Sequence, residues 1–206
     1  VVPNAVDVDA LQCAPRHEKD SYLLVLARIC PDKGQHHAIE VAARTGMRLV
    51  LAGKVDPGNE TYFQEEIAPH LDGTRVTWHE NVGGDDKARL LTRATALLAP
   101  LTWPEPFGLS MVEAMVSGTP TVAFRRGAAP ELIDDGSTGF VVDTVDEMVD
   151  AVAAVANIDP ARCSLVARNR FSPDVMVSDY LRVYQRVLAA AGRPGRTDER
   201  QAYISA

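Results

Sequence analysis

Two glutamates eight positions apart, Glu105 and Glu113, enclose a turn with the sequence Pro-Phe-Gly-Leu. The pattern predicts a loop that leads into a helix, whose first turn has unpaired backbone N–H groups and the positive end of the helix dipole. Such a helix start favours an anion such as a diphosphate. A glutamate one to two turns further along would reach sugar hydroxyls, as an acidic residue contacts a ribose in dinucleotide-binding folds. The spacing therefore favours a nucleotide-sugar ligand over a metal ion or a nucleic acid.

Residues suited to hold a diphosphate also follow two candidate strands nearer the N-terminus. Arg28 leaves the end of an apolar run, and Lys33 precedes a helical pattern. An arginine fork and a mobile lysine charge together suit a diphosphate. Spacing alone favours the alternative, in which Arg28 pairs with a surface carboxylate and Lys33 is solvated. Gly53 ends another candidate strand, where its backbone would admit a ligand closely, although a glycine in this place is more often simply a turn.

Short apolar runs alternate with amphipathic segments, and this alternation predicts the elements that position these residues. The expected strands are Tyr22–Ala27, Arg48–Ala52, Arg75–Trp78, Ala96–Ala99, Thr119–Ala123 and Gly139–Val142. The expected helices are Gly34–Thr45, Glu60–His70, Asp85–Arg93, Gly108–Val116, Ala128–Asp134, Met148–Ala156, Pro160–Asn169 and Asp174–Ala191. Such regular alternation predicts an α/β fold, a Rossmann-like doubly wound parallel sheet of about six strands flanked by helices. Ligands of such sheets bind outside the carboxyl ends of the strands.

Size and composition restrict the class of protein. A chain of 206 residues with 46% hydrophobic residues is expected to form one domain over residues 1–191, followed by a loose polar tail at 192–206. A net charge of −7 argues against a nucleic-acid partner. No apolar run approaches the ~20 residues of a membrane span. The three cysteines have no paired metal spacing and are typical of reduced thiols in a cytoplasmic protein. No cluster of His, Cys, Asp and Glu has metal-ligand spacing, so we expect no metal, and we expect no cofactor.

Several motifs in order resemble one protein family. Residues 2–7 (Val-Pro-Asn-Ala-Val-Asp) are similar to its "PNGVD" entry, and residues 27–34 to its "GR…KG" element. Glu105 to Glu113 fits its E-x7-E motif, and residues 118–120 and 136–140 match its "GTP" and "DGxTGF" signatures. Over residues 1–188 the chain therefore resembles the donor-binding, C-terminal half of retaining glycosyltransferases with the GT-B fold, family 4 (group 1).

This resemblance implies roles for individual residues. Arg28 and Lys33 would hold the diphosphate of the donor and stabilise charge on the leaving nucleoside diphosphate, while Glu105 would lie against the transferred sugar. Glu113 would bind the ribose hydroxyls. The backbone N–H groups of the turn would face the phosphates or the sugar, and the remaining donor-binding positions would lie close to the nucleotide: Phe107, Gly108, Leu109, Gly53 and Val82, the last beside the base.

The resemblance also implies partners. The donor is expected to be a UDP-sugar or a GDP-sugar, and no metal ion is required. An acceptor-binding N-terminal domain is expected to be missing from this chain, which begins without methionine or a signal sequence. Because the active site would lie between the two domains, the isolated chain should transfer sugar poorly. The full-length enzyme would be cytoplasmic, with contact to a membrane surface left open. A nucleotide-sugar-binding module without catalysis of its own is the alternative, and a GT-B-type epimerase is a weaker one.

The chain departs from the family pattern at some positions. Glu80 stands where the family commonly has glycine near the base, and it is followed by an unusual Gly83-Gly84 pair. The basic turn Phe124-Arg125-Arg126-Gly127 is expected to be a surface turn that pairs with the acidic Asp134-Asp135 segment. A role of this turn near the donor or the acceptor is the alternative.

Overall fold

Six parallel strands form a single sheet in the order β3-β2-β1-β4-β5-β6. The computed structural model describes residues 1–191, and the loose tail expected at 192–206 lies outside the described residues. The strands are β1 (Tyr22–Leu26), β2 (Arg48–Ala52), β3 (Val76–His79), β4 (Ala96–Ala99), β5 (Thr121–Phe124) and β6 (Gly139–Val142). The predicted doubly wound α/β fold with six strands is therefore confirmed, and only strand ends differ, by one or two residues.

The helices follow the predicted segments, with shifted ends. They are α1 (Gln35–Thr45), α2 (Glu60–Tyr62), α3 (Gly84–Arg93), α4 (Leu109–Val116), α5 (Ala129–Leu132), α6 (Val145–Ala154), α7 (Pro160–Phe171) and α8 (Pro173–Ala191). Single 3₁₀ turns lie at η1 (Arg16–Glu18), η2 (Pro31–Lys33) and η5 (Val155–Asn157). At the start of α6 the Thr144 side chain accepts a hydrogen bond from the Glu147 N–H at 3.2 Å and so caps the helix.

The prediction of one regular helix at Glu60–His70 is wrong. Residues 60–70 form three short pieces instead of one α-helix, namely α2, a π-helical stretch η3 (Phe63–Ile67) and a 3₁₀ turn η4 (Ala68–His70). Pro69 has no N–H to donate to the preceding turn, so the α-helical hydrogen-bond ladder cannot continue through it. The amphipathic pattern predicted the helical character of the segment, and the proline decided its irregular end.

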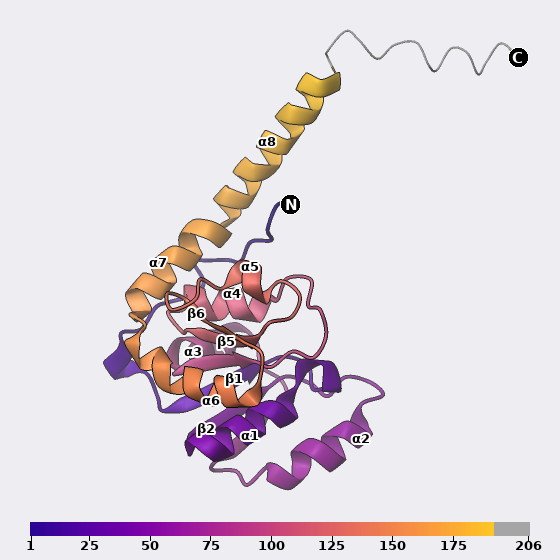
Figure 1. The fold of residues 1–206 in the computed structure, drawn as a ribbon, viewed down its shortest axis with the longest axis vertical. Helices are drawn as coiled ribbons and strands as arrows, with labels where there is room; N and C mark the ends of the chain where they lie inside the picture. The colour runs from indigo at the N-terminus through magenta and orange to yellow at the C-terminus, as the bar shows by residue number, and fades with distance from the viewer. Residues whose placement is uncertain (192–206) are drawn as a thin grey trace, which may run out of the picture.

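The sheet is buried on both faces because alternate residues of each strand pack on opposite sides. Leu23 and Val25 of β1 pack with α1 and α6, while Leu24 between them packs in the second cluster with α3, α4 and α7. Figure 1 shows α1 and α6 together on one side of the sheet. This explains why the strands are apolar nearly throughout, as is typical of parallel sheets covered by helices on both faces.

The strand order places a crevice between β1 and β4. From β1 the chain winds outward through β2 to β3, and then crosses back to β4 on the other side of β1. The connections after β1 and after β4 therefore leave toward opposite faces of the sheet, and a crevice opens outside their carboxyl ends. The segments that leave these two ends contain Arg28, Lys33 and Glu105.

The last helix, α8, projects away from the sheet (Figure 1). None of its residues is buried, although it carries a series of exposed apolar side chains: Val177, Tyr180, Leu181, Val183, Tyr184, Val187 and Leu188. None of the helices in residues 1–191 combines the length and the apolar character that a bilayer-spanning helix requires.

Candidate functional site

The loops that follow β1 and β4 are joined to each other at the crevice. The Thr102 N–H donates a hydrogen bond to the Asp32 carbonyl at 3.0 Å, and its hydroxyl donates to the Pro31 carbonyl at 3.2 Å. Gly34 ends the η2 turn with φ of 68°, and a Cβ on it would lie 2.0 Å from the Pro100 carbonyl oxygen. Only glycine permits both this backbone angle and this close approach. The two loops therefore act as one platform.

Lys33 and Glu105, one from each loop, form an ion pair on this platform. The Lys33 ammonium contacts the Glu105 carboxylate at Oε2, and both side chains are mostly buried, with 14% and 16% of their side-chain surface exposed. A small cavity of about 30 Å³ lies beside them, lined also by Gly108, Ser110 and Met111 and by the ends of β1 and β4. It has room for roughly one water molecule. The sequence predicted that Lys33 is bound to phosphate or solvated, and in the structure it is paired with Glu105, the residue expected to lie against the transferred sugar.

Arg28 has a different partner. Its guanidinium lies 2.6 Å from the Asp56 carboxylate, which raises the pKa of Arg28, and 63% of its side-chain surface is exposed. This is the surface ion pair that the sequence left open as the alternative. Because the arginine is exposed, the pair is weak and its guanidinium can exchange Asp56 for another anion.

The turn before α4 presents free N–H groups. The N–H groups of Phe107, Gly108 and Leu109 have no hydrogen-bond partner within residues 1–191. Gly108 has φ of 91°, a backbone conformation that residues with a Cβ rarely adopt, so the turn favours glycine. The geometry matches the expected loop-to-helix junction, with unsatisfied donors at the positive end of a helix dipole.

Glu113 lies further along α4 and faces a second cavity. Its carboxylate accepts a hydrogen bond from the Lys87 ammonium of α3 at 2.6 Å, with 17% of the glutamate side chain exposed. A cavity of about 280 Å³ lies here, lined also by Asp7, Leu11, Gly84 and Ala88. Val82 precedes α3 and packs partly buried against the same hydrophobic cluster as α4. The two glutamates of the motif therefore have different lysine partners and border different cavities.

Gly53 has a role in the packing of the fold. Its φ is 143°, and a Cβ on it would lie 2.1 Å from the Ala27 carbonyl oxygen at the end of β1. Its own carbonyl accepts a hydrogen bond from the indole of Trp78 at 2.9 Å. The glycine is thus required by the neighbouring strand, and a contact between its backbone and a ligand stays a prediction.

The basic turn after β5 has other partners than expected. Arg125 pairs with Asp143 at 3.2 Å, while the predicted partner Asp134 pairs with Arg170 at 2.7 Å. The expected pairing with Asp134-Asp135 was therefore wrong, because β6 runs alongside β5 and brings Asp143 to the end of that strand. The turn packs against the site instead: the Ala128 N–H donates to the Glu105 carbonyl at 2.9 Å.

Three residues near the site were missed by sequence reasoning. Trp103 donates an indole hydrogen bond to Glu105, Lys87 pairs with Glu113, and Asp56 pairs with Arg28. Trp103 stands two residues before the motif, so its position was the available signal. The other two contacts join side chains 26 and 28 positions apart, and no local pattern indicates them.

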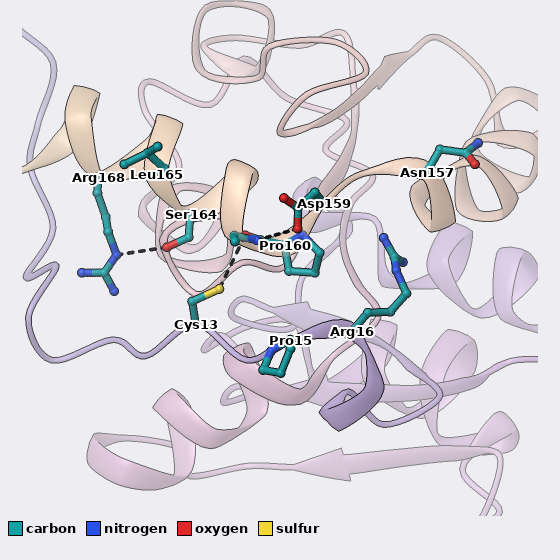
Figure 2. Close-up of a pocket in the computed structure, with 10 residues that line it drawn as sticks. Cys13, Pro15, Arg16, Asn157, Asp159, Pro160, Ser164, Leu165 and Arg168 are labelled. Atoms are coloured by element: carbon teal, nitrogen blue, oxygen red, sulfur yellow. Dashed lines mark hydrogen bonds between the residues drawn. The ribbon is translucent and has the colours of Figure 1, made fainter.

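A larger hollow than the two cavities of the candidate site lies elsewhere, between the N-terminal segment and α7 (Figure 2). It measures about 700 Å³, and Cys13, Arg16, Pro160 and Arg168 line it. Figure 2 shows Cys13 close to the start of α7, where its thiol contacts the Pro160 carbonyl at 3.5 Å. None of the predicted site residues borders this hollow, so its size alone does not mark it as the site.

Comparison with known proteins adds a family. A model of "Glycosyl transferases group 1" matches residues 11–170. The chain is 27% identical over 209 residues to a phosphatidyl-myo-inositol mannosyltransferase of Mycobacterium leprae, covering 93% of this chain and 54% of that protein. It is 33% identical over 162 residues to an MMP alpha-(1->4)-mannosyltransferase of Mycolicibacterium hassiacum, covering 75% of this chain and 38% of that protein.

Solved structures show the same architecture. AviGT4, a glycosyltransferase involved in avilamycin A biosynthesis, superposes with a TM-score of 0.78 at 31% identity, over 92% of this chain and 58% of its own. Anabaena Alr3699/HepE in complex with UDP-glucose superposes with a TM-score of 0.75 at 23% identity, over 92% of this chain and 57% of its own. The chain thus spans about half the length of the relatives that it matches.

Proposed function

Because the chain belongs to the glycosyl transferases group 1 family and has the Rossmann-like sheet of one half of a GT-B fold, we propose that it binds the sugar donor of a retaining glycosyltransferase. The enzyme would move a sugar from a nucleoside diphosphate sugar to an acceptor without a metal ion. One observation carries the proposal. Lys33 and Glu105, from the ends of two strands, meet at the crevice between β1 and β4, next to the free N–H groups that precede α4.

The diphosphate of the donor would take over the cations that carboxylates hold in the free protein. Lys33 would leave Glu105 and bind phosphate oxygens, and Arg28 would leave Asp56 and do the same. The N–H groups of Phe107, Gly108 and Leu109 would donate to the same phosphates or to the sugar. As the nucleoside diphosphate leaves, its growing negative charge is balanced by groups already in place, which is the largest single contribution in many enzymes.

Glu105, released from Lys33, would then face the transferred sugar. The sugar becomes positively charged in the transition state of glycosyl transfer, so a carboxylate beside it is stabilising. Glu113 would bind the ribose hydroxyls in the cavity that it shares with Lys87, while Val82 and Gly53 would contact the nucleotide through their backbones. Retention follows from attack by the acceptor on the face of the leaving group, which the family resemblance favours over a covalent intermediate.

The donor would be a UDP-sugar or a GDP-sugar. A structure similar in fold is a complex with UDP-glucose, and the relatives include mannosyltransferases. The acceptor would bind to a further domain, since the chain spans about half of its relatives and the apolar side chains of α8 are exposed here. The three free cysteines suit the cytoplasm. The alternative is a binding module whose catalysis a partner protein completes.

Calorimetric titration of UDP, GDP and ADP tests the donor site. We expect UDP or GDP to bind the wild-type chain, with affinity lowered at least about tenfold by Lys33→Ala and by Glu113→Ala, because each removes a direct contact with the nucleotide. Glu40→Ala is the matched control, since Glu40 pairs with Arg44 on the exposed surface of α1. The assignment fails if none of the three nucleotides binds, or if both site variants bind like the control.

An assay of sugar transfer separates the enzyme from the module. We expect the isolated chain to bind the donor but to transfer its sugar poorly. Transfer by residues 1–206 at a rate typical of complete enzymes would contradict this expectation.

A further inference from the structure

One aromatic side chain contacts both charged groups at the crevice. The indole Nε1–H of Trp103 donates a hydrogen bond to Oε2 of Glu105 at 3.1 Å, the same oxygen that contacts the Lys33 ammonium. The Lys33 nitrogen also lies 5.1 Å from the centre of the Trp103 ring, within the range of a cation–π interaction. Trp103 is half-buried, so neither contact is fully exposed to solvent.

The backbone holds this indole in a narrow range of positions. The Glu105 N–H donates to the Trp103 carbonyl at 3.0 Å, which closes a tight turn around Pro104. Pro104 and Pro106 have fixed φ angles on either side of Glu105. On the far side, Gly127 lies so close that a Cβ on it would be 2.2 Å from the Glu105 carbonyl oxygen. The orientation of Trp103 toward Glu105 is therefore set by the chain around it.

The two contacts have different consequences when a donor arrives. If Lys33 moves to a phosphate, Glu105 loses its counter-ion in a mostly buried place, where an unpaired carboxylate is costly. The indole N–H remains as a charged hydrogen bond that holds the carboxylate in position. The ring face stays available to the ammonium, so Lys33 does not lose every favourable contact while it changes partners.

We propose that Trp103 is a positioning residue that keeps Glu105 directed at the donor sugar while Lys33 exchanges Glu105 for the donor diphosphate. This inference rests on the proposed function and assigns to Trp103 no contact with the donor. Lys33 and Glu105 then recognise different parts of the donor: Lys33 binds the diphosphate, and Glu105, held in place by the indole, faces the sugar.

Titration of Trp103→Phe with UDP and with UDP-glucose tests the proposal, with GDP and GDP-mannose as the second pair. Phenylalanine keeps an aromatic face for Lys33, although a smaller one than indole, and has no N–H to donate to Glu105. We expect the affinity for the nucleotide alone to stay within about threefold of wild type, the size of a small change in a cation–π contact. In Trp103→Phe, the ratio of the affinity for the nucleotide sugar to the affinity for the nucleotide should become equal to the ratio in Glu105→Gln. The double variant of Trp103 and Glu105 should have this same ratio. Tyr22→Phe is the control, because it removes one hydrogen bond, to the Leu90 carbonyl, and keeps the ring.

Fluorescence of Trp103 gives a readout that does not depend on a preference for the sugar. The chain has two tryptophans, so in a Trp78→Phe background the emission comes from Trp103 alone. We expect Glu105→Gln to change this emission without any ligand, and UDP to change it as Lys33 leaves. The inference is wrong, while the proposed function stands, if UDP binds by calorimetry but neither Glu105→Gln nor UDP changes the Trp103 emission. It is equally wrong if Trp103→Phe leaves the affinity ratios of UDP-glucose to UDP and of GDP-mannose to GDP unchanged. If no nucleotide binds the wild type, the proposed function itself fails.

Discussion

Gly127 couples the turn after β5 to the loop that carries Glu105, and its substitution tests how the site is held. Gly127 has φ of 52°, and a Cβ added to it would lie 2.2 Å from the carbonyl oxygen and 2.3 Å from the nitrogen of Glu105. Both neighbours are backbone atoms, so the contact cannot be relieved by rotating a side chain. Gly127→Ala must therefore displace the loop that contains Glu105.

The magnitude follows from two contributions. Alanine at positive φ costs about 1–2 kcal/mol. Displacement of the loop also weakens the hydrogen bond from the Ala128 N–H to the Glu105 carbonyl, which contributes about 1 kcal/mol. We expect Gly127→Ala to lower the free energy of unfolding by about 2–3 kcal/mol. Gly136→Ala is the matched control, because Gly136 has φ of 73° with no atom within 4 Å of its added Cβ. The control has only the backbone contribution.

Urea denaturation with calorimetry measures both effects. The two variants should differ by about 1 kcal/mol in the free energy of unfolding, a shift of roughly 0.5 M in the urea midpoint at a typical slope. Gly127→Ala should also weaken UDP-glucose binding several-fold, because it moves Glu105, whereas Gly136→Ala should not. Equal destabilisation by the two variants, with unchanged binding in both, would refute the reasoning.

Three further predictions concern stability. Burial lowers the pKa of Lys19 from 10.5 to about 8; its charged form therefore destabilises the fold below pH 8, and the cost is lost as the pH rises toward 10.5. Lys19→Met also removes the hydrogen bonds from the Lys19 ammonium to the Thr92 carbonyl and the Thr119 hydroxyl, so the pH dependence is the test: in urea denaturation, the stability of Lys19→Met relative to wild type should fall between pH 8 and 10.5. Three backbone N–H groups lower the pKa of Asp72 to about 2, so Asp72→Asn should lower the melting temperature at pH 7 and lose this effect as the pH falls from about 4 to 2; a constant effect would contradict the assignment. Leu181→Lys with Leu188→Lys on α8 should change the free energy of unfolding of this chain by less than about 0.5 kcal/mol per site, since both side chains are exposed.

The sequence alone determined the strands, most of the helices and the family. Strands buried on both faces must be apolar along their whole length, and the apolar residues of an amphipathic helix recur every three to four positions. Both patterns are local, so they can be recognised in the sequence. The motif from Glu105 to Glu113 is local for the same reason, because a turn and the helix that it opens are contiguous in the chain. The predicted helix at residues 60–70 failed where Pro69 interrupts the ladder of hydrogen bonds.

Only the tertiary structure decided which charges meet. Lys33 and Glu105 are 72 positions apart and become partners because the chain crosses back from β3 to place β4 beside β1. The pairs of Glu113 with Lys87 and of Arg28 with Asp56 depend in the same way on how α3 packs on α4 and on how the loops after β1 and β2 lie side by side. Sequence periodicity reports which face of an element is buried, but the partner of a charged side chain is set by the packing of distant segments. The sequence therefore predicted the residue types at the proposed donor site, but it did not predict which of these residues pair in the free protein.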